Sequence, residues 1–597
     1  MGELRSILPY FRPYMRSFYW GIVCVFFANL FQAAGPYFIK LSIDGLGDAR
    51  VSGTRIGTYA GLIVLTALIG GVARYGMREL LNGMSRRIEC DLRNNFFRHL
   101  LRLDATFYGS IRTGDLMSRA TNDTLAVRMA VGPAIMYTVN TAVSFVLALA
   151  LMLFLSPKLT LYAMIPMIVL PPTVLGFGRI VHRRFEEIQE QFSSLSTFVQ
   201  ENLTGVRLIR AYTQESEQAK QFDAFNDDYR RKNMNLVLTA GAFHPTLMLI
   251  SGAAMVLVTW LGALEVIAGA MTLGDFVAFG FYLALLIWPM IALGWVVNLY
   301  QRGSASMGRL NKILNAQPVV VVPEKPASLE GASGRIEFRD VSFTYPQTER
   351  EVLSGINFTA APGETVAIVG PTGSGKSTLI GLLARVYDPT GGQVLLDGVP
   401  LSDYDPGDLR LRIGMVPQDS FLFSDTIADN IGLGLDLNDP LLSESGRPAD
   451  VLVTAARLAQ LHDQIEEFPT GYGTILGERG INLSGGQKQR ATLARAIARD
   501  PLILVLDDSL SAVDTHTEAQ ILEDLRQVMN DRTSFIISHR VSAVMHADRI
   551  LVLDAGTIAE RGTHIELLAA DGTYARLLRR QLLEEVLESE IAAVAGE

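Results

Sequence analysis

Six long apolar segments dominate the first half of the chain. They lie near residues 17–39, 56–77, 131–155, 159–181, 236–264 and 273–300, and none follows residue 303. Each is long enough to cross a hydrocarbon core of about 30 Å as a helix. The first segment is too long for a cleavable signal peptide and lacks a small-residue cleavage site. The pattern therefore predicts six transmembrane helices in a lipid bilayer.

The connections between these segments differ in length and charge. Those near residues 40–55, 156–158 and 265–272 are short and hold few cations, whereas those at 78–130 and 182–235 are long and rich in arginine. The positive-inside rule places the long connections and both termini in the cytoplasm. We therefore expect a multi-pass protein of the inner (cytoplasmic) membrane.

Both long connections contain apolar residues at helical spacing, so the membrane helices are expected to continue into the cytoplasm. Each connection reverses at a short polar point that contains a glycine, at residues 112–116 and 204–207. These two tips are candidates for docking helices, and simple turns are the alternative. The segment before residue 17 predicts an elbow in the membrane interface, with a frayed tail as the alternative.

The pattern changes after residue 312. Residues 313–333 contain several prolines and predict a linker, and short β-branched runs then alternate with helical ones over residues 334–572. This alternation is typical of an α/β domain. Residues 573–597 predict a charged amphipathic helix, which either pairs with the tail of a partner or packs on its own domain. The transmembrane domain is assigned to residues 1–312.

The amino-acid composition is consistent with a chain in which about half of the residues form a membrane domain. Of the 597 residues, 49% are hydrophobic, and the net charge is −9 with no basic tail. A nucleic acid is therefore not an expected partner. Cys24 and Cys90 supply neither a disulfide framework nor a spaced metal site.

Two motifs predict a site for ATP and Mg²⁺. An apolar run at residues 366–369 leads into the sequence GPTGSGKS and then an apolar helix, which is the Walker A loop in its strand-loop-helix context. In such a loop the backbone N–H groups converge on phosphate, Lys376 adds a positive charge and Ser377 a magnesium ligand. A second apolar run ends at Asp507, the Walker B arrangement, which completes the magnesium environment.

Five further motifs accompany these two along the chain. They are Tyr345 before the Walker A loop, Gln418 in VPQ, the pentapeptide LSGGQ at residues 483–487, the tetrapeptide SAVD at residues 511–514, and His539 in SHR. With these residues the chain resembles the ATP-binding cassette (ABC) family. The resemblance covers nearly the whole chain and implies the type IV exporter fold. That fold joins an all-α six-helix transmembrane domain to an α/β P-loop nucleotide-binding domain with an α-helical subdomain.

The resemblance also implies roles for individual residues. Gln418, Asp508 and His539 are the catalytic candidates, and Ser377, Gln418 and Asp507 are the magnesium ligands. The nucleotide-binding residues are Tyr345, Gly370, Pro371, Thr372, Gly373, Ser374, Gly375, Lys376, Ser377, Thr378, Gln418, Ser484, Gly485, Gly486, Gln487, Asp507 and His539. In this family each ATP lies between the Walker A loop of one cassette and the signature LSGGQ of another, so a second half-transporter is expected.

The chain departs from the family pattern at Asp508. Hydrolysing members place glutamate after the Walker B aspartate, and aspartate is shorter by one methylene. General-base action depends on hydrogen-bond reach, so we expect hydrolysis at this site to be impaired while ATP binding survives. Because of this aspartate, the chain resembles the degenerate-site subunit of heterodimeric bacterial exporters, in which the partner subunit carries the glutamate. A homodimeric exporter and an ATP-gated regulatory subunit are the alternatives.

The polar residues within the spans give a weaker indication of the transported molecule. Intramembrane polar residues usually face the bundle interior, although amides also tie helices together. The expected lining suits hydrophobic or amphipathic drugs, lipids or peptides. The candidate residues are Asn29, Gln32, Asn140, His244, Trp288, Trp295 and Asn298.

Overall fold

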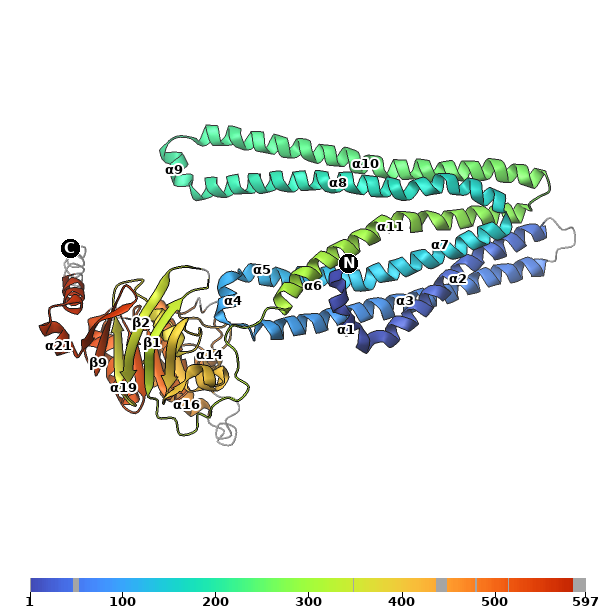
Figure 1. The fold of residues 1–597 in the computed structure, drawn as a ribbon. Helices are drawn as coiled ribbons and strands as arrows, with labels where there is room; N and C mark the ends of the chain where they lie inside the picture. Colours follow the sequence, from blue (N-terminus) through green and yellow to red (C-terminus); the bar gives the residue numbers. More distant parts are fainter. Residues whose placement is uncertain are drawn as a thin grey trace. The chain divides into compact units, whose positions relative to one another are not determined.

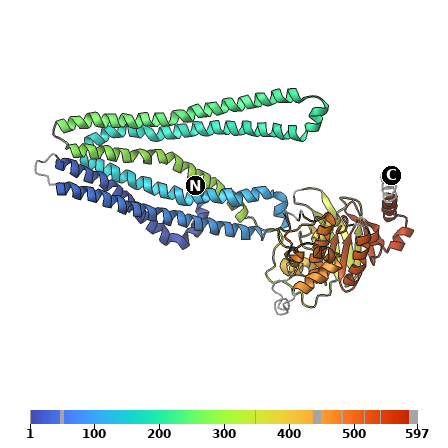
Figure 2. The same ribbon diagram turned by 180° about the vertical axis from the view of Figure 1, so that it is seen from behind.

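The computed structural model describes residues 2–46, 53–346, 348–435, 448–477, 480, 482–513, 515–538 and 540–583. It contains two compact units. The first comprises Met1–Leu101 and Thr113–Ala316, and the second comprises Arg102–Arg112 and Gln317–Glu597. Figure 1 and Figure 2 show opposite faces of the ribbon, with labels for the main elements.

Over its described residues the first unit is helical, and these residues contain the six expected helices that are long and apolar enough to cross a membrane. The third of these begins with short elements at residue 113 and becomes regular at α7. The long helices are α2 (Met15–Leu46), α3 (Gly53–Leu100), α7 (Ile135–Leu155), α8 (Pro157–Thr204), α10 (Glu215–Ile267) and α11 (Leu273–Leu314). The short elements are η1 (Gly2–Ile7), α1 (Leu8–Phe11), η2 (Arg12–Tyr14), α5 (Thr113–Ser118), η3 (Arg119–Asp123), α6 (Thr124–Met129), η4 (Ala130–Ala134) and α9 (Val206–Ala211).

The first fourteen residues are anchored to the helices behind them. Asn311 on α11 donates a hydrogen bond to Glu3 at 2.8 Å, and Asn95 on α3 donates to the hydroxyl of Tyr10 at 2.7 Å. Tyr14 donates to Asp91 at 2.9 Å. Because three separate bonds hold it, this segment has the fixed course of an elbow rather than that of a frayed tail.

Side-chain caps define two of the helix starts. Ser156 accepts a hydrogen bond from the backbone N–H of Leu159 and so caps α8, which has Pro157 at its first position. Thr272 and Asp275 form a reciprocal capping box at the start of α11. Glu265, near the end of α10, accepts from Ser156 at 3.0 Å and so ties two turns together.

Small residues allow close helix packing at two points. A Cβ atom on Gly132 would lie 2.3 Å from the hydroxyl of Ser85, and one on Gly303 would lie 2.3 Å from the Cβ of Ala130. Glycine is therefore required at both positions if the helices are to keep their separation.

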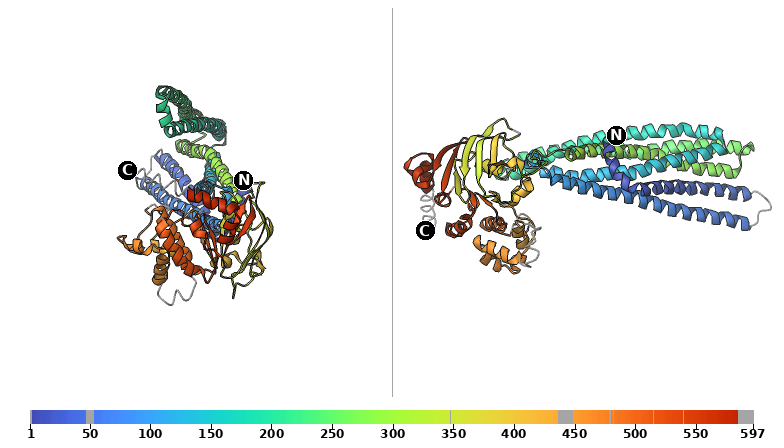
Figure 3. Two further views of the ribbon diagram at one scale, coloured as in Figure 1. Left: turned by 90° about the vertical axis from the view of Figure 1, so that its left-hand side faces the viewer. Right: turned by 60° about the horizontal axis from the view of Figure 1, so that its bottom comes forward.

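Helices α8 and α10 form a long hairpin that is joined by α9 (Figure 1, Figure 3). Near the apolar end of the hairpin, Met167 and Val258 belong to a buried cluster with Phe279 of α11. Farther along, the two helices pack on each other through ring contacts such as Phe198 with Phe225, 5.2 Å between centroids. Apolar side chains remain exposed on this part of the hairpin, including Phe185, Leu203 and Leu208.

The described residues of the second unit form two sheets. The four-stranded antiparallel sheet has the order β2-β1-β4-β5, and the six-stranded sheet has the order β10-β9-β3-β8-β7-β6, parallel except for β10. The strands are β1 (Ile336–Thr344), β2 (Glu351–Ala360), β3 (Thr365–Val369), β4 (Gly391–Leu396), β5 (Val399–Pro400), β6 (Ile413–Val416), β7 (Ile503–Asp507), β8 (Thr533–Ile537), β9 (Arg549–Asp554) and β10 (Thr557–Gly562).

The apolar runs of the parallel strands are buried on both faces, as the sequence pattern predicts. One core lies between the two sheets and includes α12, and the other lies between the parallel sheet and the remaining helices. The helices and turns of this unit are α4 (Ala105–Ser110), α12 (Lys376–Leu383), η5 (Leu401–Asp403), α13 (Pro406–Leu411), α14 (Ile427–Gly432), α16 (Pro448–Leu458), α17 (His462–Glu466), η6 (Gly471–Gly473), α18 (Gly485–Ala498), α19 (Thr515–Met529), α20 (Val541–Val544) and α21 (His564–Ala569).

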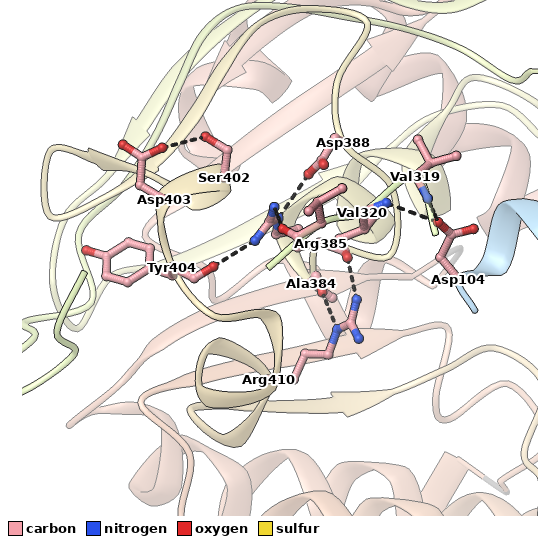
Figure 4. A network of polar contacts seen from close by, with 11 residues as sticks. Asp104, Val319, Val320, Ala384, Arg385, Asp388, Ser402, Asp403, Tyr404 and Arg410 are labelled. Atoms are coloured by element: carbon pink, nitrogen blue, oxygen red, sulfur yellow. Dashed lines mark hydrogen bonds and ion pairs between the residues drawn. The ribbon is translucent and has the colours of Figure 1, made fainter. Parts of the chain in front are cut away.

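A buried arginine connects the linker to the end of α12 (Figure 4). The guanidinium of Arg385, which is 2% exposed, donates to the carbonyl oxygens of Tyr404 at 2.8 Å and Val321 at 2.9 Å, and to Asp388 at 3.0 Å. Asp104, which caps α4, accepts from the backbone N–H groups of Val319 and Val320. The linker is thus held from both sides within this unit.

Replacing Arg385 with methionine is expected to lower the free energy of unfolding of this unit by about 3 kcal/mol, because it leaves the buried carbonyl of Tyr404, the part-buried carbonyl of Val321 and the carboxylate of Asp388 without this donor. Thermal unfolding of the full chain followed by calorimetry measures the effect. Arg339→Met is the control, since Arg339 forms an exposed pair with Glu337 and should cost less than about 1 kcal/mol. Equal shifts for the two variants would contradict the prediction.

Candidate functional site

The order of the parallel strands brings three separate motifs to one edge. Strands β3, β8, β7 and β6 are neighbours, and parallel strands end on the same side of a sheet. The loop at residues 370–375 follows β3, Asp507 and Asp508 lie at the end of β7, and Gln418 follows β6. Residues that are up to 138 positions apart in the sequence therefore meet at this edge.

The loop after β3 needs glycine at defined points. Gly370, Gly373 and Gly375 have φ angles of 154°, 80° and 101°, a region that favours glycine. A Cβ on Gly370 would also lie 2.2 Å from the carbonyl oxygen of Leu553. The loop therefore keeps a shape in which consecutive N–H groups precede the start of α12, the arrangement that binds phosphate.

Lys376 begins α12 and folds back over the loop. Its ammonium donates to the carbonyl oxygens of Gly370 at 2.8 Å and Pro371 at 2.9 Å. Burial lowers the pKa of Lys376, and the carboxylates of Asp507 and Asp508 oppose that shift. The side chain is thus a positive charge in a pocket that also holds two negative charges.

These residues line one cleft of about 320 Å³. The buried hydroxyl of Ser374 has no hydrogen-bond partner among the described residues, and a phosphate oxygen would supply one. The donor set therefore fits a nucleotide phosphate, and the hydroxyl of Ser377 and the carboxylate of Asp507 are oxygen ligands of the kind Mg²⁺ prefers. The lining residues are Tyr345, Val352, Thr372, Gly373, Gly375, Lys376, Ser377, Thr378, Gln418, Asp507, Asp508 and Ile537.

The backbone of Asp508 is fixed on both sides. Its φ angle is 47°, which is uncommon for a residue other than glycine. Its N–H donates to the carbonyl oxygen of Ile537 at 2.8 Å, and its own carbonyl accepts from the hydroxyl of Ser511 at 3.1 Å. The main chain is held at this position, so the length of the side chain decides how far its carboxylate reaches.

Known proteins resemble the chain over nearly its full length. Residues 18–290 match the ABC transporter transmembrane region and residues 353–511 match the ABC transporter domain. The "Probable multidrug resistance ABC transporter ATP-binding/permease protein YheI" of Bacillus subtilis (strain 168) is 40% identical over 97% of this chain and 98% of its own. The chain belongs to the ABC transporter family.

A second relative and a solved structure of this ABC transporter's family support the same assignment. The "Multidrug resistance-like ATP-binding protein MdlA" of Escherichia coli (strain K12) is 38% identical over 97% of this chain and 96% of its own. The solved structure of a bacterial Atm1-family ABC exporter with ATP bound matches with a TM-score of 0.76 and 28% identity, covering 95% of this chain and 98% of that chain. The expected exporter fold, with six apolar helices and a nucleotide-binding domain of sheets and helices, is confirmed.

The signature pentapeptide of this ABC transporter starts α18. The hydroxyl of Ser484 accepts from the backbone N–H of Gln487 at 3.3 Å, and the side chain of Gln487 accepts from the N–H of Ser484 at 2.9 Å. This capping box fixes the first turn of α18, where Gly485 and Gly486 present their N–H groups at the helix start. Residues 484–487 are all described, and none of them lines the cleft with Lys376.

Two residues that the sequence analysis missed position the segment after Asp508. Gln489, 6% exposed on α18, donates to the hydroxyl of Ser511 at 3.0 Å and accepts from the N–H of Ala512 at 2.9 Å. Arg540 donates to the carbonyl of Ser511 at 3.1 Å and pairs with the buried Glu518. No local motif signals these contacts, because the partners lie 22 or more positions away.

Some predicted residues lie elsewhere or outside the described part. His539, Asp514 and residues 584–597 of the predicted C-terminal helix lie outside the described residues. Pro371 contributes its carbonyl to Lys376 rather than lining the cleft. Among the membrane candidates, Asn29 is 5% exposed and donates to Asn140 at 2.9 Å, so this pair ties α2 to α7.

Tyr345 lies at the rim of the cleft, where its hydroxyl is 3.0 Å from the hydroxyl of Thr378 on α12. The resemblance to the family implies that the ring of Tyr345 stacks on the adenine base. Replacing Tyr345 with alanine is then expected to weaken ATP binding about tenfold, since an aromatic ring stacked on a base contributes roughly 1–3 kcal/mol. Titration with a fluorescent ATP analogue measures the affinity. Tyr345→Phe keeps the ring and loses the hydroxyl contact, so its affinity should change by less than about threefold. An equal loss in both variants would assign the effect to the hydroxyl.

Proposed function

We propose that the chain is one subunit of a heterodimeric ATP-driven exporter that moves hydrophobic or amphipathic compounds out of the cytoplasm or the inner leaflet. The observation that carries the proposal is Asp508 in an otherwise intact cassette. Two relatives carry names that refer to multidrug resistance, which supports drugs as one class of transported compound. Lipids and peptides are further members of the proposed class.

The fixed backbone of Asp508 supports impaired hydrolysis at this site. A general base must reach about 2.6–3.2 Å from the water that it orients. The two backbone hydrogen bonds at Asp508 oppose a shift of the main chain that would offset the missing methylene. Poor alignment of the water is therefore expected, although the binding residues are complete.

The remaining residues have separate roles in this proposal. Lys376 and the loop N–H groups hold the phosphates, and Ser377, Gln418 and Asp507 hold the metal. Bound ATP with Mg²⁺ supplies the driving force for the movement of the helices. Tyr345 positions the base, and His539 is proposed to face the terminal phosphate. Binding without turnover still biases a conformational equilibrium, provided that one state binds more tightly.

The position of the signature supports the proposal of a partner subunit. Ser484 and the N–H groups of Gly485 and Gly486 do not line the cleft of their own cassette, so they are free to complete the site of another. The exposed apolar residues of the α8–α10 hairpin also fit contact with a second subunit. The partner is proposed to carry glutamate after its Walker B aspartate, so that it completes the competent site with this chain's signature.

Alternating access is the proposed transport mechanism. The segments near residues 112–116 and 204–207 are proposed to pass cassette movement to the spans, with both termini and the cassette on the cytoplasmic side.

ATP turnover by the chain alone and by the chain paired with a half-transporter encoded next to it tests the proposal. Low turnover alone and high turnover in the pair, with ATP-dependent dye uptake into inverted vesicles, is the expected result. Robust turnover and uptake by the chain alone would instead identify a homodimeric pump, and turnover without uptake a regulatory subunit.

A further inference from the structure

An arginine and a glutamine meet within the membrane-spanning part of the first unit. A guanidinium nitrogen of Arg74 on α3 donates to the side-chain oxygen of Gln32 on α2 at 2.6 Å. Arg74 lies in the apolar segment at residues 56–77 and Gln32 in the one at residues 17–39. Arginine stays protonated in proteins, and a charge is costly in hydrocarbon, so such residues face the bundle interior or a water-filled path.

Arg74 lies on the packed side of α3. At helical spacing it shares one stripe with Gly70, Met77 and Leu81, all of which are buried. A Cβ on Gly70 would lie 3.4 Å from Phe31, which shows that this stripe faces α2. The exposed apolar residues of α3, such as Val72 at 65% exposure, lie on the other side. The guanidinium therefore extends along the side of α3 that faces α2, where Gln32 accepts its hydrogen bond.

Gln32 lies on a packed stripe of α2 in the same way. Ala28 and Pro36, one turn before and one turn after it, are both buried, whereas Gln32 is exposed. Arg74 is also exposed despite its buried neighbours. The polar ends of both side chains are thus accessible at a point where the residues above and below them are packed.

Among the residues that the structure describes, no carboxylate forms an ion pair with Arg74. The six apolar segments contain one acidic residue, Asp275, and that residue is paired with Lys40 at 2.6 Å. Among the described residues, the polar contact of Arg74 is the one with Gln32. A neutral amide oxygen leaves the positive charge available to an anion, and a guanidinium binds carboxylate or phosphate oxygens in pairs.

We propose that Arg74 and Gln32 form a subsite that binds the carboxylate or phosphate group of an amphipathic substrate. The inference rests on the proposed exporter function and narrows its substrate class to anionic amphiphiles. Arg74 supplies the charge, and Gln32 orients the guanidinium and offers its own N–H₂ group as a further donor. The apolar and aromatic residues of the spans then receive the rest of the molecule.

Binding of a matched pair of probes to the full chain in phosphatidylcholine nanodiscs tests the subsite. The probes are 11-(dansylamino)undecanoic acid and its uncharged methyl ester, and dansyl emission reports binding. The unmodified chain is expected to bind the acid at least about tenfold more tightly than the ester, as one charge-assisted contact allows. Arg74→Gln should bring this ratio close to one while the affinity for the ester is kept. Equal binding of both probes to the unmodified chain, or binding of neither, would overturn the proposal.

A second variant keeps the arginine in place. Gln32→Glu places a carboxylate beside the guanidinium of Arg74 and neutralises its charge. This variant should therefore abolish the preference for the acid without removing Arg74. Arg179→Gln, which changes the other arginine within the apolar segments, should leave the ratio unchanged. An unchanged ratio in both Arg74→Gln and Gln32→Glu refutes the subsite.

The binding assay needs no ATP, so its failure differs from a failure of the proposed function. A charge preference that depends on Arg74, together with no ATP-driven uptake, would reject the exporter and keep the subsite. Uptake without any charge preference would reject the subsite and keep the exporter. Inorganic phosphate should not displace the acid at equal concentration, and displacement would show that a free anion, rather than an amphiphile, is the ligand.

Discussion

Asp508→Glu is expected to raise hydrolysis at this chain's own ATP site about a hundredfold, in line with the 10²–10⁴-fold contribution of a well-placed general base. The added methylene extends the carboxylate from a backbone that is held by hydrogen bonds to Ile537 and Ser511. The measurement is phosphate release by the pair in which the partner's Walker B glutamate is changed to glutamine. Turnover in that sample comes from the site that contains Asp508.

Asp508→Asn is the matched control for this experiment. Asparagine has the size of aspartate and cannot accept a proton, so turnover should stay within about twofold if Asp508 contributes little. A tenfold loss in Asp508→Asn would mean that the aspartate already acts as the base. The degenerate-site proposal would then be replaced by a homodimeric pump.

Ser484→Asp is expected to lower the turnover of the pair by at least about a hundredfold, comparable to the loss of an oriented donor at a developing charge. Aspartate is a good N-cap, so α18 should still form. Its negative charge, however, lies beside the N–H groups of Gly485 and Gly486, which are proposed to face the terminal phosphate of the partner's site.

Ser484→Asn separates charge from shape, because asparagine also caps a helix and is neutral. The pair with this variant should keep turnover within about tenfold of the unmodified pair. The two variants are compared by phosphate release at saturating ATP and by thermal unfolding. Equal turnover for Asp and Asn would show that Ser484 does not approach a phosphate in the competent site.

Much of the site could be predicted from the sequence because its parts are local. The glycines of the Walker A loop, the capping Ser484 with Gln487 three residues later, and the aspartates at the end of β7 each lie within a few positions of one another. Such spacings fix φ angles, caps and strand ends with little help from distant contacts. The six spans are equally local, since each depends on a continuous run of apolar residues.

Other features depend on contacts between distant segments. The neighbour order β3-β8-β7-β6 places Lys376, Asp507 and Gln418 in one cleft, and this order does not follow the order of the chain. Gln489 and Arg540 hold the segment after Asp508 through partners that no motif predicts. Arg74 belongs to none of the sequence motifs, and its significance appears only beside Gln32.

The sequence by itself determined the six spans, the cassette motifs and the departure at Asp508, because hydropathy, turn geometry and helix caps act over a few residues. Only the tertiary structure decided that the backbone of Asp508 is pinned, that Arg385 holds the linker, and that Arg74 lies on a packed stripe. Each of these facts depends on which surfaces pack together. Packing depends on the complementarity of whole surfaces. The sequence pattern shows which side of a helix or strand is apolar, but it does not show which other element packs against that side.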